Sequence, residues 1–331
     1  MAFGTLTEQL DTMYTATWRI RRKEIVDQVF NATPFYYLMM KNGRKRSESG
    51  GRSIEEPLRY GKNETVTSVG RGDTVELEYT DVLRVSNWDW KYVTGHILRY
   101  FTDEQKNRGK QAQINMVNSA IDTLRDSLID DFETKLFADG TGNAGKDING
   151  LGNIVPIDPT AGTVGTIDRA TYPWWRSNVR NMIDEEVSVH LLPRMRTMWN
   201  DCGQLGMSKS RFPNFIVCDQ ATYEKYEEEC FEIGRIQMPD KGMMDLGFGE
   251  LAFKGAPITW SPACPANTMF FLNSEFLSFI VDNFAFMKLG EWMPIYNTPG
   301  PDKVGHNMSV CNLTASNMAK HGRIYNIDVS S

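Results

Sequence analysis

TDEQKNRGKQAQINMVNSAIDTLRDSLIDDFETKLFADG, residues 102–140, is the only stretch of the sequence long and periodic enough to fix an architecture. Apolar side chains recur in it at steps of three and four residues, which lays one apolar stripe along an α-helix. The stripe consists of Ile114, Val117, Ile121, Leu124, Leu128, Phe132 and Leu136. Thr102 or Asp103 can cap the start, and Asp139-Gly140 supplies a stop where the chain needs a left-handed residue. A helix over 103–138 would be a rod of about 50 Å, so we expect an elongated or flat domain.

The charges on this helix oppose what helix stability favours. Basic residues lie towards its start, and acidic residues towards its end, namely Asp122, Asp126, Asp130, Asp131 and Glu133. Three of these acids repeat at four-residue steps, where like charges cost a few tenths of a kcal/mol per pair. One interpretation is a solvated acidic face. We prefer the interpretation that the face meets a basic surface elsewhere in the chain or on another copy.

Composition indicates an ordinary globular protein of 331 residues, with 41% hydrophobic and 24% charged residues. No apolar run is long enough to span a bilayer, and Met1–Leu10 lacks the regions of a signal peptide, so we expect no membrane partner and a cytoplasmic origin. The five cysteines are widely spaced and form no C-x-x-C, which indicates neither a disulfide framework nor a zinc site.

The net charge of −6 is unevenly distributed. Residues 1–50 hold 8 Lys and Arg against 5 Asp and Glu, a net +3 that leaves the remainder at −9. Arg19 and Arg22 belong to a basic cluster in this leading segment. Such clusters can hold phosphates, but an overall acidic chain with a pI of 5.4 argues against a dedicated nucleic-acid binder. We favour pairing between subunits.

A charged, turn-rich segment runs from Gly50 to about Ser86. Residues 75–80 alternate between apolar and polar, as in a strand with one buried face, and the predicted partner strand is 53–60. Joined by 62–71, the two strands would form a long hairpin. A two-stranded hairpin is at best marginal alone, so something outside it must hold it.

Before and after this hairpin the chain is more apolar. Residues 5–42 are predicted as two short helices broken near Thr33-Pro34. The run PFYYLMM, 34–40, is too apolar for a free arm, and it can lie either on another surface or on its own domain. Residues 82–100 are predicted as extended chain with Trp88, Trp90 and Tyr92 on one face.

The second half is predicted as mixed α and β structure. GTGNAG, 140–145, formally fits the dinucleotide pattern G-x-G-x-x-G, but a helix rather than a strand precedes it, so we reject that interpretation. The predicted elements are a helix over 191–203 entered through Pro193, a strand at 215–218, a helix at 220–231, strands in 251–260 and 269–281, and a strand or strand pair in 307–327 that returns to the first domain.

No enzyme signature is present in the sequence. The four histidines have no metal-ligand spacing, and neither G-x-S-x-G nor a P-loop occurs. Glu55-Glu56 and Asp130-Asp131 are adjacent pairs whose side chains diverge on a strand or helix, so they form no acid/base dyad. We therefore expect no catalytic residue, cofactor or metal. A cytoplasmic α/β enzyme that uses the middle region is the alternative from another class.

The order of elements is arm, charged hairpin, strand, very long helix, α/β region and strand-rich end. This order resembles the major capsid protein of tailed double-stranded DNA phages, an α+β protein with the Hong Kong-97-like fold. The resemblance covers nearly the whole chain. The stretches that carry it are INGLGNIVP from Ile148, IDRATYPWWRSNV from Ile167, PNFIVCDQATYEKYE from Pro213, LAFKGAPITWSPACPANTMFFLN from Leu251 and NLTASNMAKHGRIYNI from Asn312.

The resemblance implies five segments: an N-terminal arm at 1–50, an extended loop at 51–86, a peripheral domain with a spine helix at 87–140, an axial domain at 141–285, and C-terminal strands at 286–331 that return to the peripheral domain. It also implies pentamers and hexamers of this chain in an icosahedral shell, located in the virion and assembled in the host cytoplasm. Packaged double-stranded DNA would lie nearby without specific contacts, and portal and scaffolding proteins would be partners. An encapsulin-like compartment is the alternative within the fold.

On this interpretation the hairpin is a clasp that lies across the neighbouring subunit. The candidate subunit-contact residues are Glu55, Glu56, Arg59, Lys62 and Arg71 in the extended loop, Asp122, Asp126 and Asp130 on the long helix, and Arg19 and Arg22 in the arm.

Overall fold

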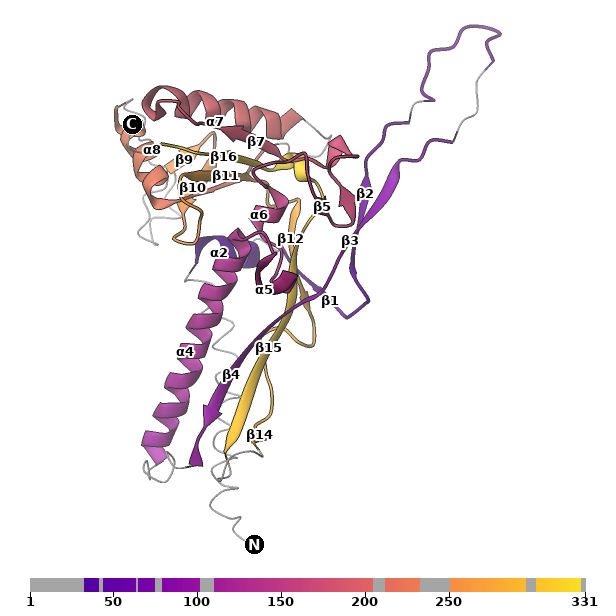
Figure 1. Ribbon diagram of the computed structural model, residues 1–331. Coiled ribbons are helices and arrows are strands. Elements are labelled where there is room, and N and C mark those ends of the chain that lie inside the picture. Colours follow the sequence, from indigo (N-terminus) through magenta and orange to yellow (C-terminus); the bar gives the residue numbers. More distant parts are fainter. Residues whose placement is uncertain are drawn as a thin grey trace.

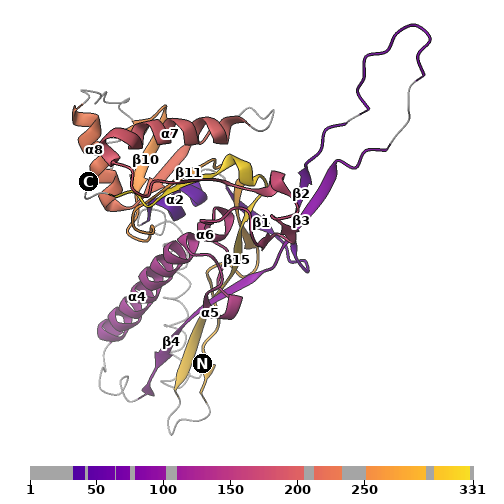
Figure 2. The ribbon, with the colours of Figure 1, turned by 45° about the horizontal axis from the view of Figure 1, so that its top comes forward.

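The computed structural model describes residues 33–41, 44–63, 65–74, 79–101, 110–204, 212–232, 251–295 and 302–328. Figure 1 shows an elongated molecule in which a long helix and long strands form one end, a second sheet with its helices forms the other, and a two-stranded ribbon projects from the side. In the turned view of Figure 2 the ribbon again stands clear of the body. The elongated shape that the long helix predicted is confirmed.

The long helix α4 spans Lys110–Phe137. Its apolar stripe is confirmed over the part whose side chains are described, since Ile121, Leu128, Phe132 and Leu136 are all buried. The helix ends where predicted, and Gly140 has the left-handed conformation, with φ +75°. The predicted start at Thr102 or Asp103 lies outside the described residues.

The first sheet lies beside α4 and is built on one long strand, β15, Lys303–Ala315. Its other strands are β1 Lys45–Glu48, β4 Lys91–Arg99, β12 Leu277–Asp282, β13 Lys288–Leu289 and β14 Met293–Pro294. β4 pairs antiparallel with β15 from Lys91 opposite Cys311 to Arg99 opposite Lys303. The helix approaches β4 closely at Gly95, where an added Cβ would lie 2.6 Å from a methyl carbon of Leu124.

Helix α2, Pro34–Lys41, packs on its own domain. Phe35, Tyr36 and Met39 are fully buried, and the Tyr36 ring stacks on Phe132 of α4 with centroids 5.8 Å apart. The interpretation of PFYYLMM as a helix on its own domain is therefore confirmed. The predicted break near Thr33-Pro34 coincides with the start of α2. Proline fits this position because the first turn of a helix does not need the N–H that proline lacks.

Glu133 corrects our interpretation of the acidic residues on α4. Its side chain is buried rather than part of a solvated face. One carboxylate oxygen accepts a hydrogen bond from the Tyr36 backbone N–H at 3.0 Å, and the other accepts one from Ser261 Oγ at 2.7 Å. Burial raises the pKa of Glu133, against these hydrogen bonds, which lower it. The residue joins α4 to the first turn of α2 and to the second sheet.

The second sheet has the strand order β7-β16-β11-β8-β10-β9. The strands are β7 Asn178–Asn181, β8 Phe215–Cys218, β9 Leu251–Phe253, β10 Ala256–Trp260, β11 Thr268–Leu272 and β16 Gly322–Tyr325. Helices α7, Val187–Gln204, and α8, Gln220–Glu232, lie against it (Figure 1). The predicted strand at 215–218 and helix at 220–231 are confirmed.

Three predictions in this half are corrected. Helix α7 begins at Val187, so Pro193 lies inside the helix and not at its start. Proline has no N–H to donate to the carbonyl of Val189, four residues earlier, but Val189 is exposed and water can bond that carbonyl instead. Residues 251–260 form two strands separated by a turn with positive φ at Lys254 and Gly255. Residues 269–281 form two strands that belong to different sheets, β11 and β12.

The chain crosses between the two sheets within the segments assigned to the axial domain and the C-terminal strands. β12 comes from the segment assigned to the axial domain but lies in the first sheet, whereas β16 comes from the C-terminal segment but lies in the second. Of the strand or strand pair predicted in 307–327, β15 lies in the first sheet beside α4, and β16 does not. Burial explains the exchange, because β12 and β16 each carry residues that are almost fully enclosed in the sheet they join.

The loop 148–155 closes the end of α4. The short helix α6, Leu151–Ile154, buries its apolar side chains, and the Gly152 N–H donates to the carbonyl of Ala138 at 3.0 Å. Gly150 lies so close that an added Cβ would be 2.4 Å from the carbonyl oxygens of both Lys135 and Ala138. The INGLG segment, 148–152, therefore covers the C-terminal end of α4, and only glycine fits at position 150.

We predict that Gly150→Ala lowers the free energy of unfolding of the dissociated subunit by about 3 kcal/mol or more, because the clash is with backbone that cannot move aside. Chemical denaturation followed by circular dichroism measures this. Gly61→Ala is the matched control, since its Cβ would make ordinary contacts at 3.4 Å and should change the free energy by less than about 0.5 kcal/mol. Equal effects of the two changes would contradict the prediction.

We also predict that His321 makes folding sensitive to acid. The side chain is fully buried, with its Nδ1 accepting a hydrogen bond from the Asn273 N–H at 3.3 Å, and burial lowers the pKa of His321 from 6.5 to about 3. Between these pH values the unfolded chain binds a proton that the folded chain does not, so stability falls as the pH drops from 6.5 towards 3, by up to about 1.4 kcal/mol per pH unit. The difference in unfolding free energy between the native protein and His321→Asn should shrink over this window, and a difference independent of pH would count against it.

Candidate subunit-contact surfaces

The projecting ribbon consists of β2, Ile54–Arg59, and β3, Leu83–Trp88, in antiparallel register from Ile54 opposite Trp88 to Arg59 opposite Leu83. The hairpin is confirmed, but its second strand is 83–88 and not 75–80. Of the predicted strand, residues 75–78 lie outside the described residues, and Tyr79 is 95% exposed outside any strand. Pairing is set where side chains such as Ile54 and Trp88 are buried, rather than by the more regular sequence alternation of 75–80.

The base of the ribbon is held by the segment 163–175 of the same chain. The Asn87 N–H donates to the carbonyl of Gly165 at 3.1 Å, and the Tyr60 ring stacks on Trp174 with centroids 5.1 Å apart. The Arg84 guanidinium lies 4.1 Å from the ring centroid of Tyr172. These contacts supply the outside support that a two-stranded hairpin needs. The aromatic run from Tyr172 thus anchors the ribbon.

The two faces of the ribbon differ in what covers them. Directly opposite residues share a face, so one face carries Ile54 with Trp88, Glu56 with Ser86, and Leu58 with Arg84, and it turns towards the body. The other face carries Glu55 with Asn87, Pro57 with Val85, and Arg59 with Leu83. Leu83 and Val85 are 68% and 44% exposed. The described part of this chain leaves the outward face uncovered.

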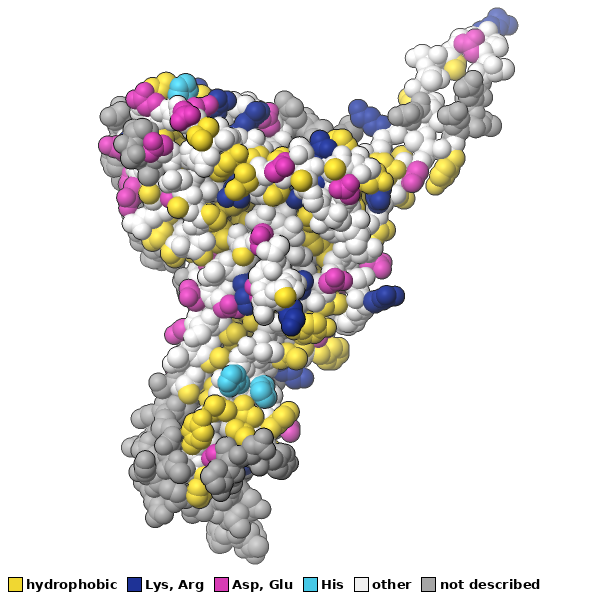
Figure 3. All heavy atoms as spheres, in the orientation of Figure 1, with side chains coloured by type: hydrophobic (Ala, Val, Ile, Leu, Met, Phe, Trp, Pro, Cys, Tyr) yellow, Lys and Arg dark blue, Asp and Glu magenta, His cyan; other side chains and the backbone are white. Residues whose placement is uncertain are grey.

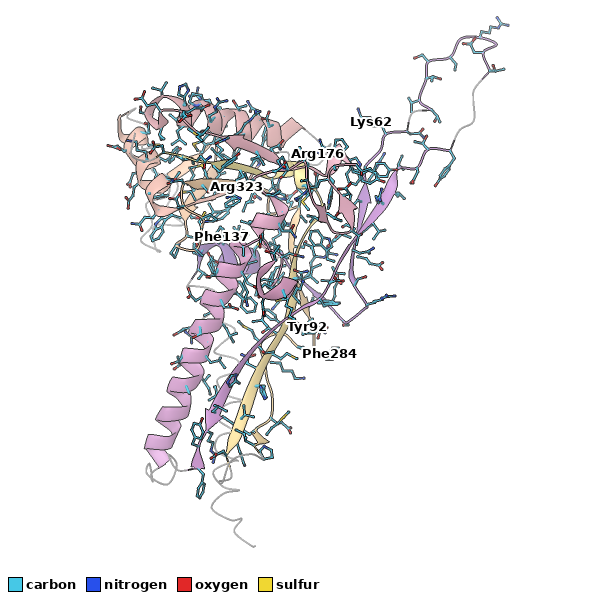
Figure 4. All side chains as sticks on the ribbon, viewed as in Figure 1. Lys62, Tyr92, Phe137, Arg176, Phe284 and Arg323 are labelled. Carbon is cyan, nitrogen blue, oxygen red and sulfur yellow. The ribbon has the colours of Figure 1, made fainter. Side chains whose placement is uncertain are left out.

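Apolar exposure continues beyond the strands. Val66 is 82% exposed and Val69 is 56% exposed, on chain that Figure 1 shows well away from the body. Lys62, labelled in Figure 4 where the ribbon leaves the body, and Arg71 are also exposed. Together with Leu83 and Val85, these residues leave several apolar side chains in water along the ribbon.

Glu56 differs from the other predicted contact residues of the ribbon. It is 6% exposed, on the inward face, and its Oε1 accepts a hydrogen bond from the Arg46 guanidinium of β1 at 2.5 Å. Burial raises the pKa of Glu56, and the Arg46 charge opposes that shift. Glu56 thus pairs within its own chain, while Glu55 and Arg59 beside it are exposed.

The acidic face of α4 is partly compensated within the chain. The Arg125 guanidinium lies 3.8 Å from an Asp122 oxygen and 3.3 Å from an Asp126 oxygen. Lys135 likewise lies 2.7 Å from Asp131 and 3.5 Å from Asp147. Exposed pairs of this kind are worth little, and the Asp126 side chain stays 67% exposed. Asp130 is exposed as well, whereas Arg19 and Arg22 lie outside the described residues.

A second exposed surface was missed in the sequence: the face of the first sheet that points away from α4. Tyr92, His96 and Leu98 of β4 lie on it, opposite Val310, His306 and Val304 of β15. Figure 3 shows the two histidines side by side among apolar side chains. Tyr92 is 62% exposed and Trp88 only 3%, so the prediction that they share one face is wrong; β3 ends between them and the chain turns into β4.

Among the described residues, no group of three or more His, Cys, Asp or Glu side chains could hold a metal ion. Within the same residues, no helix is long and apolar enough to cross a bilayer. The GTGNAG segment follows α4 and contains only the four-residue helix α5, Gly142–Gly145, so it lacks the strand that a dinucleotide site requires.

Comparison with known proteins gives matches in structure alone. No protein-family model and no curated protein sequence matches the chain. The structure is similar to a subunit of the cyanophage A-1(L) capsid, with a TM-score of 0.68, 17% identity, and coverage of 89% of this chain and 93% of that one. It is also similar to the SrpI encapsulin of Synechococcus elongatus, with a TM-score of 0.55, 11% identity, and coverage of 90% and 89%. A third similar structure is the capsid of Myoviridae phage XM1, with a TM-score of 0.54, 8% identity, and coverage of 87% and 91%.

Proposed function

Because this chain has the Hong Kong-97-like capsid fold, we propose that it is the major capsid protein of a tailed phage. In this role it assembles into pentamers and hexamers of an icosahedral shell that encloses double-stranded DNA. The proposal is supported by structural likeness to phage capsid subunits over nearly the whole of both chains. It makes the protein a structural component of the virion, assembled in the host cytoplasm, with no catalytic residue, cofactor or metal required for that role.

The observation that carries the proposal is the outward face of the ribbon. The base is fixed to the body by hydrogen-bonded and stacked residues, so the ribbon projects in a defined direction. Its outward residues Leu83 and Val85, and Val66 beyond them, stay in water. Fully burying one large apolar side chain contributes about 1.5–3 kcal/mol. A neighbouring copy that covers this face would gain that free energy at several side chains at once, and the ribbon would act as a clasp.

Charge supports the same arrangement. The body is acidic, and the basic cluster with Arg19 and Arg22 lies in the leading segment. Asp126 and Asp130 on α4 are exposed and can pair with basic residues of another copy, as can Glu55, Arg59, Lys62 and Arg71 of the ribbon. An acidic surface also leaves packed DNA free to move, because it does not neutralise phosphates. Portal and scaffolding proteins are the further partners that we propose.

Electron microscopy of the purified full-length protein tests the proposal. Closed particles of uniform size, built from pentamers and hexamers, are the expected result. A small soluble oligomer at all protein concentrations would contradict a shell and favour the α/β enzyme.

An encapsulin-like compartment is the second candidate, favoured by the likeness to the SrpI encapsulin. Native particles purified from the source distinguish the two. Nuclease-protected double-stranded DNA supports the phage capsid, whereas an enclosed enzyme and no protected DNA support the compartment.

We predict that deletion of 62–71 leaves the subunit folded but blocks assembly. The deletion spares the β2–β3 ladder and the contacts at its base, and shortening a loop changes the free energy of unfolding only slightly. Sedimentation velocity measures assembly, and denaturation measures subunit stability.

Ile54→Ala on the inward face is the control for the deletion. Ile54 is fully buried, so this change should lower subunit stability by about 2–5 kcal/mol. Normal particles from the deletion variant would overturn the clasp.

We further predict that Asp126→Lys impairs assembly while it changes the unfolding free energy of the subunit by less than about 0.5 kcal/mol. Glu228→Lys on α8 is the matched control, because the Glu228 side chain is 65% exposed and pairs with Lys225 at 3.3 Å, much as Asp126 is exposed beside Arg125. Light scattering during assembly should show a loss for Asp126→Lys alone. Equal losses in folding and assembly would favour the solvated-face or core explanation over a role between copies.

A further inference from the structure

His96 and His306 form a pair whose position is fixed by the sheet. They are directly opposite each other in the antiparallel ladder of β4 and β15, with three of the nine consecutive pairs on one side of them and five on the other. Their ring centroids lie 6.3 Å apart, with the ring planes inclined by 52°. Both side chains are exposed, so each ring can rotate without disturbing the core. The backbone thus holds two imidazoles together on one face, far from the ribbon.

The separation of the rings suits a shared ligand. A metal ion lies about 2.0–2.1 Å from an imidazole nitrogen, so two rings on one ion have centroids about 5 Å apart at a tetrahedral angle and at most about 6.5 Å apart when the nitrogens lie on opposite sides of the ion. The observed separation of 6.3 Å is inside the upper limit and about 1 Å longer than the tetrahedral value. Small rotations about the side-chain bonds of either exposed residue would bring the nitrogens to an angle suited to a tetrahedral ion.

We propose that His96 and His306 form a binding site for a divalent transition-metal ion of the zinc class, with water completing the coordination. The neighbouring ladder positions on the same face hold Thr94 and Leu98 on β4 and Val304 and Met308 on β15, none of which is a carboxylate. Two imidazoles without carboxylates favour Cu²⁺, Ni²⁺ and Zn²⁺ over Mg²⁺ and Ca²⁺. The bound ion connects β4 to β15 and stabilises the folded subunit by mass action.

The other described cysteine and histidine side chains are less suited to bind such an ion than this pair. Cys202, Cys218, Cys264 and Cys311 are buried, so their thiols are closed to an ion in solution. His190 is exposed on α7 and has no histidine opposite it, which makes it a matched single imidazole. Two ligands on rigid strands act at a high effective concentration, so the pair should bind at least about tenfold more tightly than either imidazole alone.

Isothermal titration of the full-length protein with Zn²⁺ tests the proposal. The expected result is one site per subunit that weakens at least about tenfold in His96→Gln and in His306→Gln but not in His190→Gln or Cys230→Ser. Mg²⁺ should give no heat of binding. All four variants change side chains that are at least partly exposed, and circular dichroism confirms that each is folded.

Spectroscopy of the Cu²⁺-loaded protein provides a second readout. Its electron paramagnetic resonance spectrum should show two coordinated nitrogens in the native protein and a different, weaker complex in either single variant. Zn²⁺ binding that persists unchanged in both single variants would overturn the proposal, as would the absence of binding below about 1 mM, the affinity expected of an isolated weak ligand.

Discussion

The aromatic cluster around Phe132 is the contact on which the rest of the subunit depends. Phe132 packs against Tyr36 of α2 and against Phe279 of β12 at 6.3 Å between centroids, while Phe35 meets Phe137 one turn further along α4. Three segments far apart in sequence are joined there. Glu133 adds directed hydrogen bonds to the same junction, and Gly150 allows the next segment to close the helix end directly above it. The long helix can therefore extend beyond the rest of the subunit, because α2, β12 and the loop 148–155 all pack against its C-terminal end.

The body and the ribbon show how the same residue types serve opposite purposes. At the base, Ile54 and Trp88 are enclosed and set the register, whereas Leu83 and Val85 on the other face remain in water. The charges divide in the same way: Glu56 pairs with Arg46 inside the chain, and Arg59 points outward. Alternation along a strand thus separates residues that fold the subunit from residues that can join subunits.

Sequence periodicity predicted those elements whose buried residues follow from the pattern within the element itself. The stripe of α4, the left-handed stop at Gly140 and the strand at Phe215–Cys218 follow from local pattern alone. Pairing between distant segments could not be predicted in this way. The regular alternation of 75–80 gave the wrong partner for β2, since the choice is made by Trp88 and its contacts near Gly165. The burial of Glu133 and the meeting of His96 with His306 likewise depend on partners far away in the chain.

The strand exchange between the two sheets bears on how the subunit can change shape. β11 continues into β12 through 273–276, and β15 continues into β16 through 316–321, so the polypeptide passes between the sheets twice in the same neighbourhood. These passages are bonded to each other: the Ser316 N–H donates to the carbonyl of Phe276 at 2.9 Å, and the Asn273 N–H donates to His321. A rotation of one sheet against the other must twist both passages together. The paired passages therefore oppose independent rotation of the two sheets.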